Sequence, residues 1–196
     1  MKANEFQQRY NALFNKNWRV KNYKRALPLL MFAGRDGYSH AQNLLGYAFD
    51  TGRGSIRDAS KAVYWYKRAA DGGSIEAAYN LAILYAKGDG VRKNEQKAFD
   101  LCKRAARKRH VWASCNLGTM YAEGKGTKAD PRIAVEWWRK AARRGDAKAQ
   151  LNLGLAYLEG DGVRVNQKLA KMWLGRAARN GYKKAAKVLR ARGYSI

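Results

Sequence analysis

The residue types that most often perform catalysis or bind metal ions are sparse in this sequence. His40 and His110 are its two histidines, and together with Cys102 and Cys115, its two cysteines, they form no zinc-ligand motif. The chain also contains no Walker loop and no glycine fingerprint after a strand. The sequence therefore predicts no catalytic residues, no metal site, no cofactor and no enzymatic activity.

Two glycine-flanked aspartates come closest to an ion-binding loop. They are Asp89, in residues 88–90, and Asp161, in residues 160–162. Each loop offers a single carboxylate, whereas calcium requires several converging oxygen ligands. A turn between two helices, in which glycine accepts a positive φ, is the better explanation of both loops.

The charge of the chain is strongly unbalanced. Forty Lys and Arg residues stand against fifteen Asp and Glu, which gives a formal net charge of +25. Such a surface favours a partner of opposite charge: an acidic protein, a nucleic acid, another polyanion or an anionic membrane surface. The excess is equally explained by solubility alone, and both interpretations stay open.

Much of the positive charge is clustered where second helices of a repeating unit are expected to end. We call these residues the basic edge: Lys67, Arg68, Lys103, Arg104, Arg107, Lys108, Arg139, Lys140, Arg143, Arg144 and Arg176. Cations stabilise a helix C-terminus through the helix dipole, so a solvated basic face is one interpretation. The density of charge from Lys103 to Arg109 exceeds that need and favours a binding surface.

Targeting signals are not evident in the sequence. Residues 1–10 are polar, and the longest apolar run, residues 26–33, contains Pro28 and is too short to cross a bilayer. Two cysteines do not make a disulfide framework. We expect a cytoplasmic protein without membrane insertion; its oligomeric state is left open.

An internal repeat of 36 residues dominates the chain. Small, apolar and aromatic residues recur in register: Ala41, Ala77, Ala113, Ala149 and Ala185; Leu45, Leu81, Leu117, Leu153 and Leu189; Phe49, Tyr85, Tyr121 and Tyr157; Ala62, Ala98, Ala134 and Ala170; Ala69, Ala105, Ala141 and Ala177. Glycines recur in the same way at 52, 88, 124 and 160 and again at 54, 90, 126 and 162. This many columns in register predict a repeat protein built from identical structural units.

Each unit is expected to contain two helices. The first ends at the Gly-x-Gly turn, and the second begins after a helix-capping residue: Asp58, Asn94, Asp130 or Asn166. The second helix closes near a glycine, except in the third unit, where Arg109 replaces it and predicts a strained or rearranged turn. Trp65, Trp137 and Trp173 are expected to fill the space between helix layers, and Cys102 to be a buried thiol.

The columns resemble the Sel-1-like repeat family, which is related to tetratricopeptide repeats. The resemblance rests on Ala77, Leu81, Tyr85 and residues 88–91, followed by Ala98 and residues 105–106. The same pattern recurs from Ala149 to Ala178 and covers about residues 38–190 strongly. Some secreted members carry a cysteine pair in every repeat, a pattern that this chain lacks. The resemblance implies an adaptor or scaffold that binds proteins or peptides in a concave groove.

The repeat and the resemblance together predict an all-α fold, a right-handed α-solenoid of about five 36-residue helix-turn-helix units plus a C-terminal capping helix. Residues 1–196 are expected to form a single solenoid domain. Its expected parts are a degenerate N-terminal capping repeat at 1–37, with Glu5 and Tyr10 out of pattern, repeats at 38–73, 74–109, 110–145 and 146–181, and the capping helix at 182–196.

The tetratricopeptide register, if it carries over, places a groove along the first helices. The side chains expected there are Tyr47, Tyr79, Asn80, Ile83, Trp112, Asn116, Thr119, Leu151, Asn152 and Leu155. Side-chain amides can bind an extended peptide backbone, and Trp112 would suit an energetic hot spot. The alternative for the asparagines is that they bond to neighbouring helices and only hold the stack together.

Two functional hypotheses follow. The first is a non-enzymatic scaffold that binds a partner protein or peptide in the groove; the partner could be acidic, such as a cognate effector or toxin or a secretion partner. The second is electrostatic, sequence-independent binding of nucleic acid or another polyanion along the basic edge, with a steep salt dependence.

Overall fold

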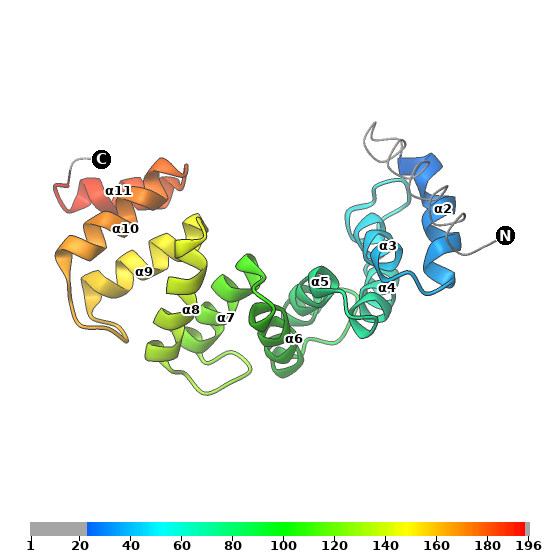
Figure 1. Ribbon diagram of the computed structural model, residues 1–196, viewed down its shortest axis with the longest axis horizontal. Helices are drawn as coiled ribbons and strands as arrows, with labels where there is room; N and C mark the ends of the chain where they lie inside the picture. The colour runs from blue at the N-terminus through cyan, green and yellow to red at the C-terminus, as the bar shows by residue number, and fades with distance from the viewer. Residues whose placement is uncertain (1–22, 195–196) are drawn as a thin grey trace. The chain divides into compact units, whose positions relative to one another are not determined.

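The computed structural model describes residues 23–194, which form ten α-helices and no β-strand (Figure 1). The helices belong to two compact units, divided between Asn94 and Glu95, and each unit is described by itself. The N-terminal unit contains α2 (Tyr23–Arg35), α3 (Ser39–Thr51), α4 (Ala59–Asp71) and α5 (Ile75–Lys87). The C-terminal unit contains α6 (Glu95–Arg107), α7 (Val111–Glu123), α8 (Pro131–Arg143), α9 (Ala147–Glu159), α10 (Gln167–Arg179) and α11 (Lys183–Ala191).

Helices that follow one another in the sequence pack against each other within each unit. In the C-terminal unit this series runs from α6 to α11, and in the N-terminal unit from α2 to α5 (Figure 1). The helices from α2 to α10 each contain 13 residues, so a helix pair with its two turns fills one 36-residue period. The predicted all-α repeat fold is confirmed, whereas the single-domain division of residues 1–196 stays a prediction.

Three of the four predicted capping residues form side-chain hydrogen bonds to the helix that follows. The side-chain oxygens of Asp58, Asp130 and Asn166 accept backbone N–H groups in the first turns of α4, α8 and α10. Asn94 directly precedes α6. Such acceptors satisfy backbone donors that a helix start leaves unpaired, and each contributes about 1 kcal/mol.

Both glycines of the Gly-x-Gly turn have a structural reason. The first, as at Gly124, ends the helix in the left-handed conformation with a φ of 68°. The second also has a positive φ and lies against the first residue of an earlier helix: a Cβ on Gly126 would be 2.1 Å from the Glu95 carbonyl oxygen. Likewise, a Cβ on Gly162 would lie 2.2 Å from the Pro131 carbonyl oxygen. Close backbone approach therefore fixes the spacing of successive repeats within the C-terminal unit.

Arg109 ends the third helix pair in a strained conformation, as predicted. Its φ is 66°, and it is the one non-glycine residue with a positive φ in the described part of the chain. The equivalent turns use Gly37, Gly73, Gly145 and Gly181, whose φ values lie between 81° and 92°. The turn is thus strained but not rearranged, and α7 begins in register after it.

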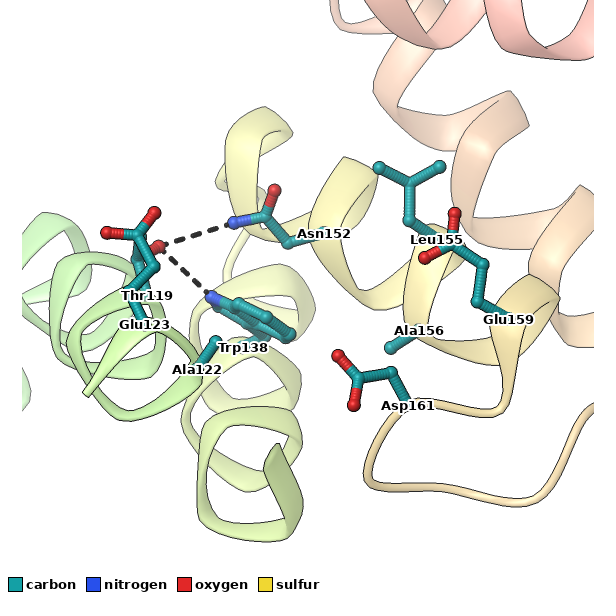
Figure 2. A pocket seen from close by; sticks show the side chains of 9 residues that line it. All are labelled: Thr119, Ala122, Glu123, Trp138, Asn152, Leu155, Ala156, Glu159 and Asp161. Carbon is teal, nitrogen blue, oxygen red and sulfur yellow. Dashed lines mark hydrogen bonds between the residues drawn. The ribbon is translucent and has the colours of Figure 1, made fainter. Parts of the chain in front are cut away.

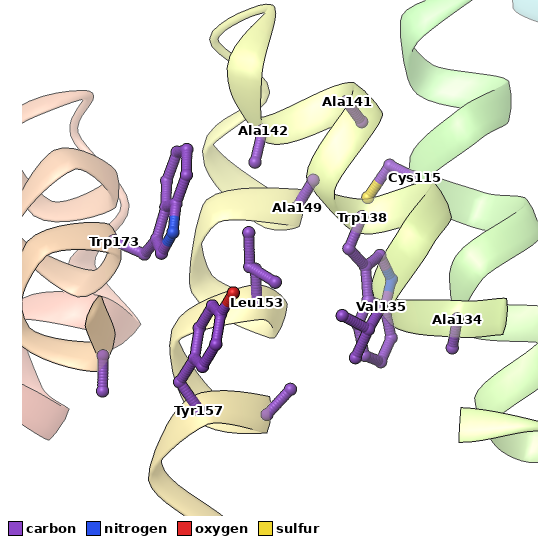
Figure 3. Packing of buried hydrophobic residues seen from close by; sticks show 12 residues of the cluster. Cys115, Ala134, Val135, Trp138, Ala141, Ala142, Ala149, Leu153, Tyr157 and Trp173 are labelled. Atoms are coloured by element: carbon purple, nitrogen blue, oxygen red, sulfur yellow. The ribbon is translucent and has the colours of Figure 1, made fainter. Parts of the chain in front are cut away.

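The alanine and leucine columns form the core. Every member of the alanine columns is buried, as are the leucines from Leu45 to Leu189. Figure 3 shows how α7–α10 pack around Leu153, with Trp138 on one side and Trp173 on the other. Small residues let the helices approach closely, and the two indoles fill the remaining space.

One tryptophan lies elsewhere than expected. Trp65 and Trp173 are buried as predicted, but Trp137 is only half-buried. Its neighbour Trp138 takes the core position instead and is 7% exposed. Adjacent helix residues point about 100° apart, so only one of the pair can face the core. The Lys140 ammonium group lies 4.1 Å from the centre of the Trp137 ring and covers it.

The described part of the N-terminal capping repeat follows the expected register. Ala26 and Ala33 are buried in α2, and Gly37 has a φ of 91°. Glu5 and Tyr10 lie outside the described residues. Between residues 23 and 194, no helix has both the length and the apolar character that crossing a bilayer demands.

Candidate partner-binding site

A pocket of about 220 Å³ opens between α7, α8 and α9 in the C-terminal unit. Three residues that sequence analysis assigned to the groove line it: Thr119, Asn152 and Leu155. We call it the groove pocket; its full lining is Thr119, Ala122, Glu123, Trp138, Asn152, Leu155, Ala156, Glu159 and Asp161 (Figure 2).

The Thr119 hydroxyl is the centre of a small hydrogen-bond network in this pocket. It donates to the Cys115 carbonyl at 3.2 Å and accepts from Asn152 Nδ2 and Trp138 Nε1, each at 3.4 Å. Figure 2 shows both accepted bonds. Because the network joins three helices, it holds the Asn152 amide in one orientation, with its oxygen still available as an acceptor.

The lining of the pocket also includes three carboxylates that sequence analysis did not assign to it: Glu123, Glu159 and Asp161. Glu123 forms an ion pair with Lys125 at 2.7 Å, and this hydrogen bond raises the pKa of Lys125. A sequence signal existed, because Glu123 and Glu159 occupy one repeat column and follow Thr119 and Leu155 by one helical turn. The groove pocket is consequently acidic, although the chain as a whole is strongly basic.

The other predicted groove residues do not join this pocket. Trp112 and Asn116 are on α7 outside its lining; Trp112 is 57% exposed, and its ring contacts that of His110. Asn116 is half-buried. Leu151 is not a groove residue: it is 3% exposed and packs with Leu174 in the core.

The predicted groove residues of the N-terminal unit are half-buried: Tyr47, Tyr79, Asn80 and Ile83. The Asn80 amide donates to the Asn43 side chain at 3.4 Å. Asn80 and Asn152 therefore both bond to a side chain of the preceding first helix. This agrees with a role in stack stability and leaves a role in binding as a prediction.

The basic edge is largely exposed. Nine of its eleven residues are exposed, and Lys103 and Arg139 are half-buried. Several of its cations lie over aromatic rings one turn earlier in the same helix: Arg68 over Trp65, Lys103 over Phe99, Lys140 over Trp137 and Arg176 over Trp173. Cation–π contacts of this kind order the cationic side chains of the edge.

Neither cysteine is available for chemistry at the surface. Cys102 and Cys115 are free thiols, each 2% exposed, as the sequence predicted for Cys102. Burial raises the pKa of the Cys102 thiol to about 12 and also raises the pKa of Cys115. Among residues 23–194, no group of three or more His, Cys, Asp or Glu side chains is arranged to hold a metal ion.

The repeat family follows from both sequence and structure. Residues 39–74, 75–110, 113–146 and 147–187 match the Sel1 repeat, and these segments make up most of the chain. The chain belongs to the Sel1 repeat family. Proteins built from this repeat generally mediate protein–protein interactions, and the scaffold is typically non-catalytic. No curated protein matches the chain.

Solved structures agree with this assignment. A Sel1 repeat protein from Oxalobacter formigenes is 33% identical with a TM-score of 0.84, over 90% of this chain and 70% of that one. The protective antigen c5321 of uropathogenic Escherichia coli, which displays an SLR fold, is 28% identical with a TM-score of 0.84, and this chain spans 40% of its length. Cysteine rich protein B of Helicobacter pylori is 28% identical with a TM-score of 0.54, over 68% of this chain and 96% of that one.

Proposed function

We propose that this protein is a non-enzymatic scaffold that binds a segment of a partner protein along its first helices, with the groove pocket as the main contact. The observation that carries the proposal is the held Asn152 amide beside the half-buried Leu155. An amide oxygen and an apolar side chain in one concavity can bind the backbone and a side chain of an extended segment.

The acidic lining of the groove pocket constrains the partner. Glu123, Glu159 and Asp161 would repel aspartate or glutamate side chains placed among them. The segment that enters this pocket is therefore neutral or basic in our proposal. An acidic part of the same partner would bind the basic edge, and an effector, a toxin or a secretion partner would each satisfy this arrangement.

Polyanion binding along the basic edge is the alternative function. Of the aromatic rings beside the edge, Trp65 and Trp173 are buried and Trp137 is covered by Lys140, which leaves them poorly placed to stack on bases. A nucleic acid would thus be held by charge alone and released by salt. The two buried free thiols support the proposed cytoplasmic location.

Capture of partners from a nuclease-treated native lysate tests the proposal. Wild type is compared with Asn152→Ala and Leu155→Ala, and Val165→Ala is the matched control because Val165 is exposed on a turn outside the pocket. We expect a protein that the control retains and that the two pocket variants lose. Recovery of nucleic acid alone from an untreated lysate, with no protein in either sample, would overturn the proposal.

A further inference from the structure

A second pocket, of about 450 Å³, lies in the C-terminal unit at the turn between α6 and α7. We call it the basic-turn pocket; it is lined by Ala106, Arg109, Ser114, Trp137, Lys140, Arg143 and Arg144. Four of these seven residues carry a positive charge, and none carries a negative one. In the described part of the chain, none of these four cations forms an ion pair with a carboxylate.

The repeat supplies an internal comparison that explains why the pocket exists. One period later, Gln150 replaces Ser114 and Asn180 replaces Arg144. Gln150 Nε2 donates to the Ala142 carbonyl at 3.1 Å, and Gln150 Oε1 accepts from Asn180 at 3.0 Å. This pair, of which Gln150 is buried and Asn180 exposed, occupies the position that is open at the α6–α7 turn. Gln42 makes the same bond to the Gly34 carbonyl, at 2.9 Å, in the N-terminal unit.

Ser114 is too short to fill the equivalent space. Its hydroxyl donates instead to the His110 carbonyl, 2.9 Å away in its own helix. The opening thus coincides with a small side chain at a position where glutamine bonds across two other turns.

Arg109 is a second, independent feature of this turn. It keeps an arginine side chain in a left-handed conformation that costs a non-glycine residue roughly 1 kcal/mol or more. Its carbonyl accepts a hydrogen bond from the Arg144 guanidinium. This bond connects the α6–α7 turn to the end of α8, and both line the pocket. Strain of this kind tends to persist at functional sites. Here it places one more cation at the pocket wall.

We propose that the basic-turn pocket binds acidic side chains of a partner protein. The proposal rests on the scaffold function above and assigns the acidic contact to a defined place on the basic edge. Guanidinium groups bind carboxylates through paired N–H donors, and Arg109, Arg143 and Arg144 provide three of them in one concavity. Lys140 already covers the exposed face of Trp137, so the pocket offers charge and donors without a ring for a base to stack on.

The decisive variant is Ser114→Gln, which copies the closed turn without changing the net charge. The probe is a fluorescein-labelled peptide of six glutamates, followed by anisotropy at physiological ionic strength. We expect Ser114→Gln to melt like wild type and to weaken peptide binding at least about tenfold, a difference of about 1.4 kcal/mol.

A charge-matched pair separates the pocket from the net charge. Arg143→Gln removes a pocket cation, whereas Arg132→Gln removes an exposed cation of the same helix outside the pocket. The first should weaken peptide binding about tenfold and the second less than about twofold. Labelled hexauridylate RNA and inorganic phosphate are the comparison ligands. The affinity of the protein for either ligand should be the same in Ser114→Gln and in wild type.

Three results would overturn the inference. One is equal binding of the peptide by Ser114→Gln and wild type. Another is a loss of RNA binding, but not of peptide binding, in Ser114→Gln. The third is displacement of the peptide by inorganic phosphate at equal concentration, which would make this a site for small anions. The groove variants Asn152→Ala and Leu155→Ala change no residue of the basic-turn pocket. A failure of the acidic-peptide test can therefore be told apart from a failure of the proposed scaffold function, which the groove variants test.

Discussion

At the scale of single residues, Arg109 is the place where the chain departs furthest from its own repeat. Four equivalent turns use glycine, which adopts a positive φ without steric cost. Arginine at this position carries a Cβ that collides with its own carbonyl oxygen in the left-handed region. The strain is local, because the helices on both sides keep the 36-residue register.

Arg109→Gly should therefore raise the free energy of unfolding by roughly 0.5 to 1 kcal/mol. The gain is the backbone strain that glycine relieves, and it is reduced by the larger entropy that glycine gives to the unfolded chain. Gly145→Ala is the mirror-image control, since a Cβ there would meet no atom within 4 Å and only the φ of 92° opposes it. It should lose about 1 kcal/mol. Urea unfolding measures both, and a loss of stability in Arg109→Gly would show that its side chain stabilises the turn.

The two thiols give a prediction about pH. Burial holds the pKa of Cys102 at about 12, above the ordinary thiol value of about 8.5. The folded state thus keeps a proton that the unfolded state releases, so the stability contribution is complete below pH 8.5 and is lost as the pH rises toward 12. The free energy of unfolding should fall less steeply above pH 8.5 in Cys102→Ala than in wild type. Identical slopes, or rapid labelling of native thiols at pH 8, would contradict the burial.

At the scale of helices, close packing depends on glycines in helix interiors. A Cβ on Gly118 of α7 would lie 2.6 Å from the Trp138 ring and 3.0 Å from the Ala134 carbonyl oxygen of α8. Gly154 has the same position one repeat later, and a Cβ on it would lie 2.7 Å from the Leu174 side chain of α10. These contacts explain why α7 and α8, and α9 and α10, pack so closely despite the bulk of the facing side chains.

Gly118→Ala should destabilise the protein by roughly 1 to 3 kcal/mol, because overpacking outweighs the better helix propensity of alanine. Gly175 of α10 is the matched control: a Cβ there would meet no atom within 4 Å. Gly175→Ala should stabilise by roughly 0.5 to 1 kcal/mol. Thermal or urea unfolding distinguishes the two. A stabilising Gly118→Ala would mean that α7 and α8 have room to spare.

The sequence predicted helices, caps and core columns well because each repeats at a fixed period. It predicted less where one residue breaks the repeat. The doublet Trp137–Trp138 does not reveal which indole faces the core, and the choice depends on the packing of Gly118 against Trp138. Likewise, the basic-turn pocket coincides with serine at position 114, where the next repeat has Gln150, and this difference is recognised only by comparison with the Gln150–Asn180 pair.

The candidate site was predicted in part. Thr119, Asn152 and Leu155 line one pocket as the register suggested, but its acidic rim did not enter the prediction. Leu151 was placed on the wrong face, because a leucine at helical spacing fits core and groove equally well until the neighbouring helix is known. Trp112 remains an exposed aromatic whose role in binding is a prediction.

At the scale of the whole molecule, a repeat protein should tolerate loss of a whole period. Each helix packs mainly against its neighbours in sequence, so stability is expected to sum over helix pairs and their interfaces. Deleting residues 110–145 should leave a shorter, folded helical protein, because α9 would present to α6 the same columns that α7 does. Deleting residues 110–127 alone should unfold much of the unit. Circular dichroism and urea unfolding compare the two deletion variants. An equal loss of helix content and stability in both would contradict the 36-residue register.

The central claim is that a partner protein contacts the groove pocket, and site-specific photo-crosslinking in the native cell tests it most directly. A photoreactive phenylalanine analogue at Leu155 reports on the pocket, and the same analogue at the exposed Val165 reports on a turn of the same unit outside it. We predict a discrete protein adduct from position 155 that is absent from position 165. Adducts of equal yield at both positions, or none from 155 while 165 reacts, would contradict the account.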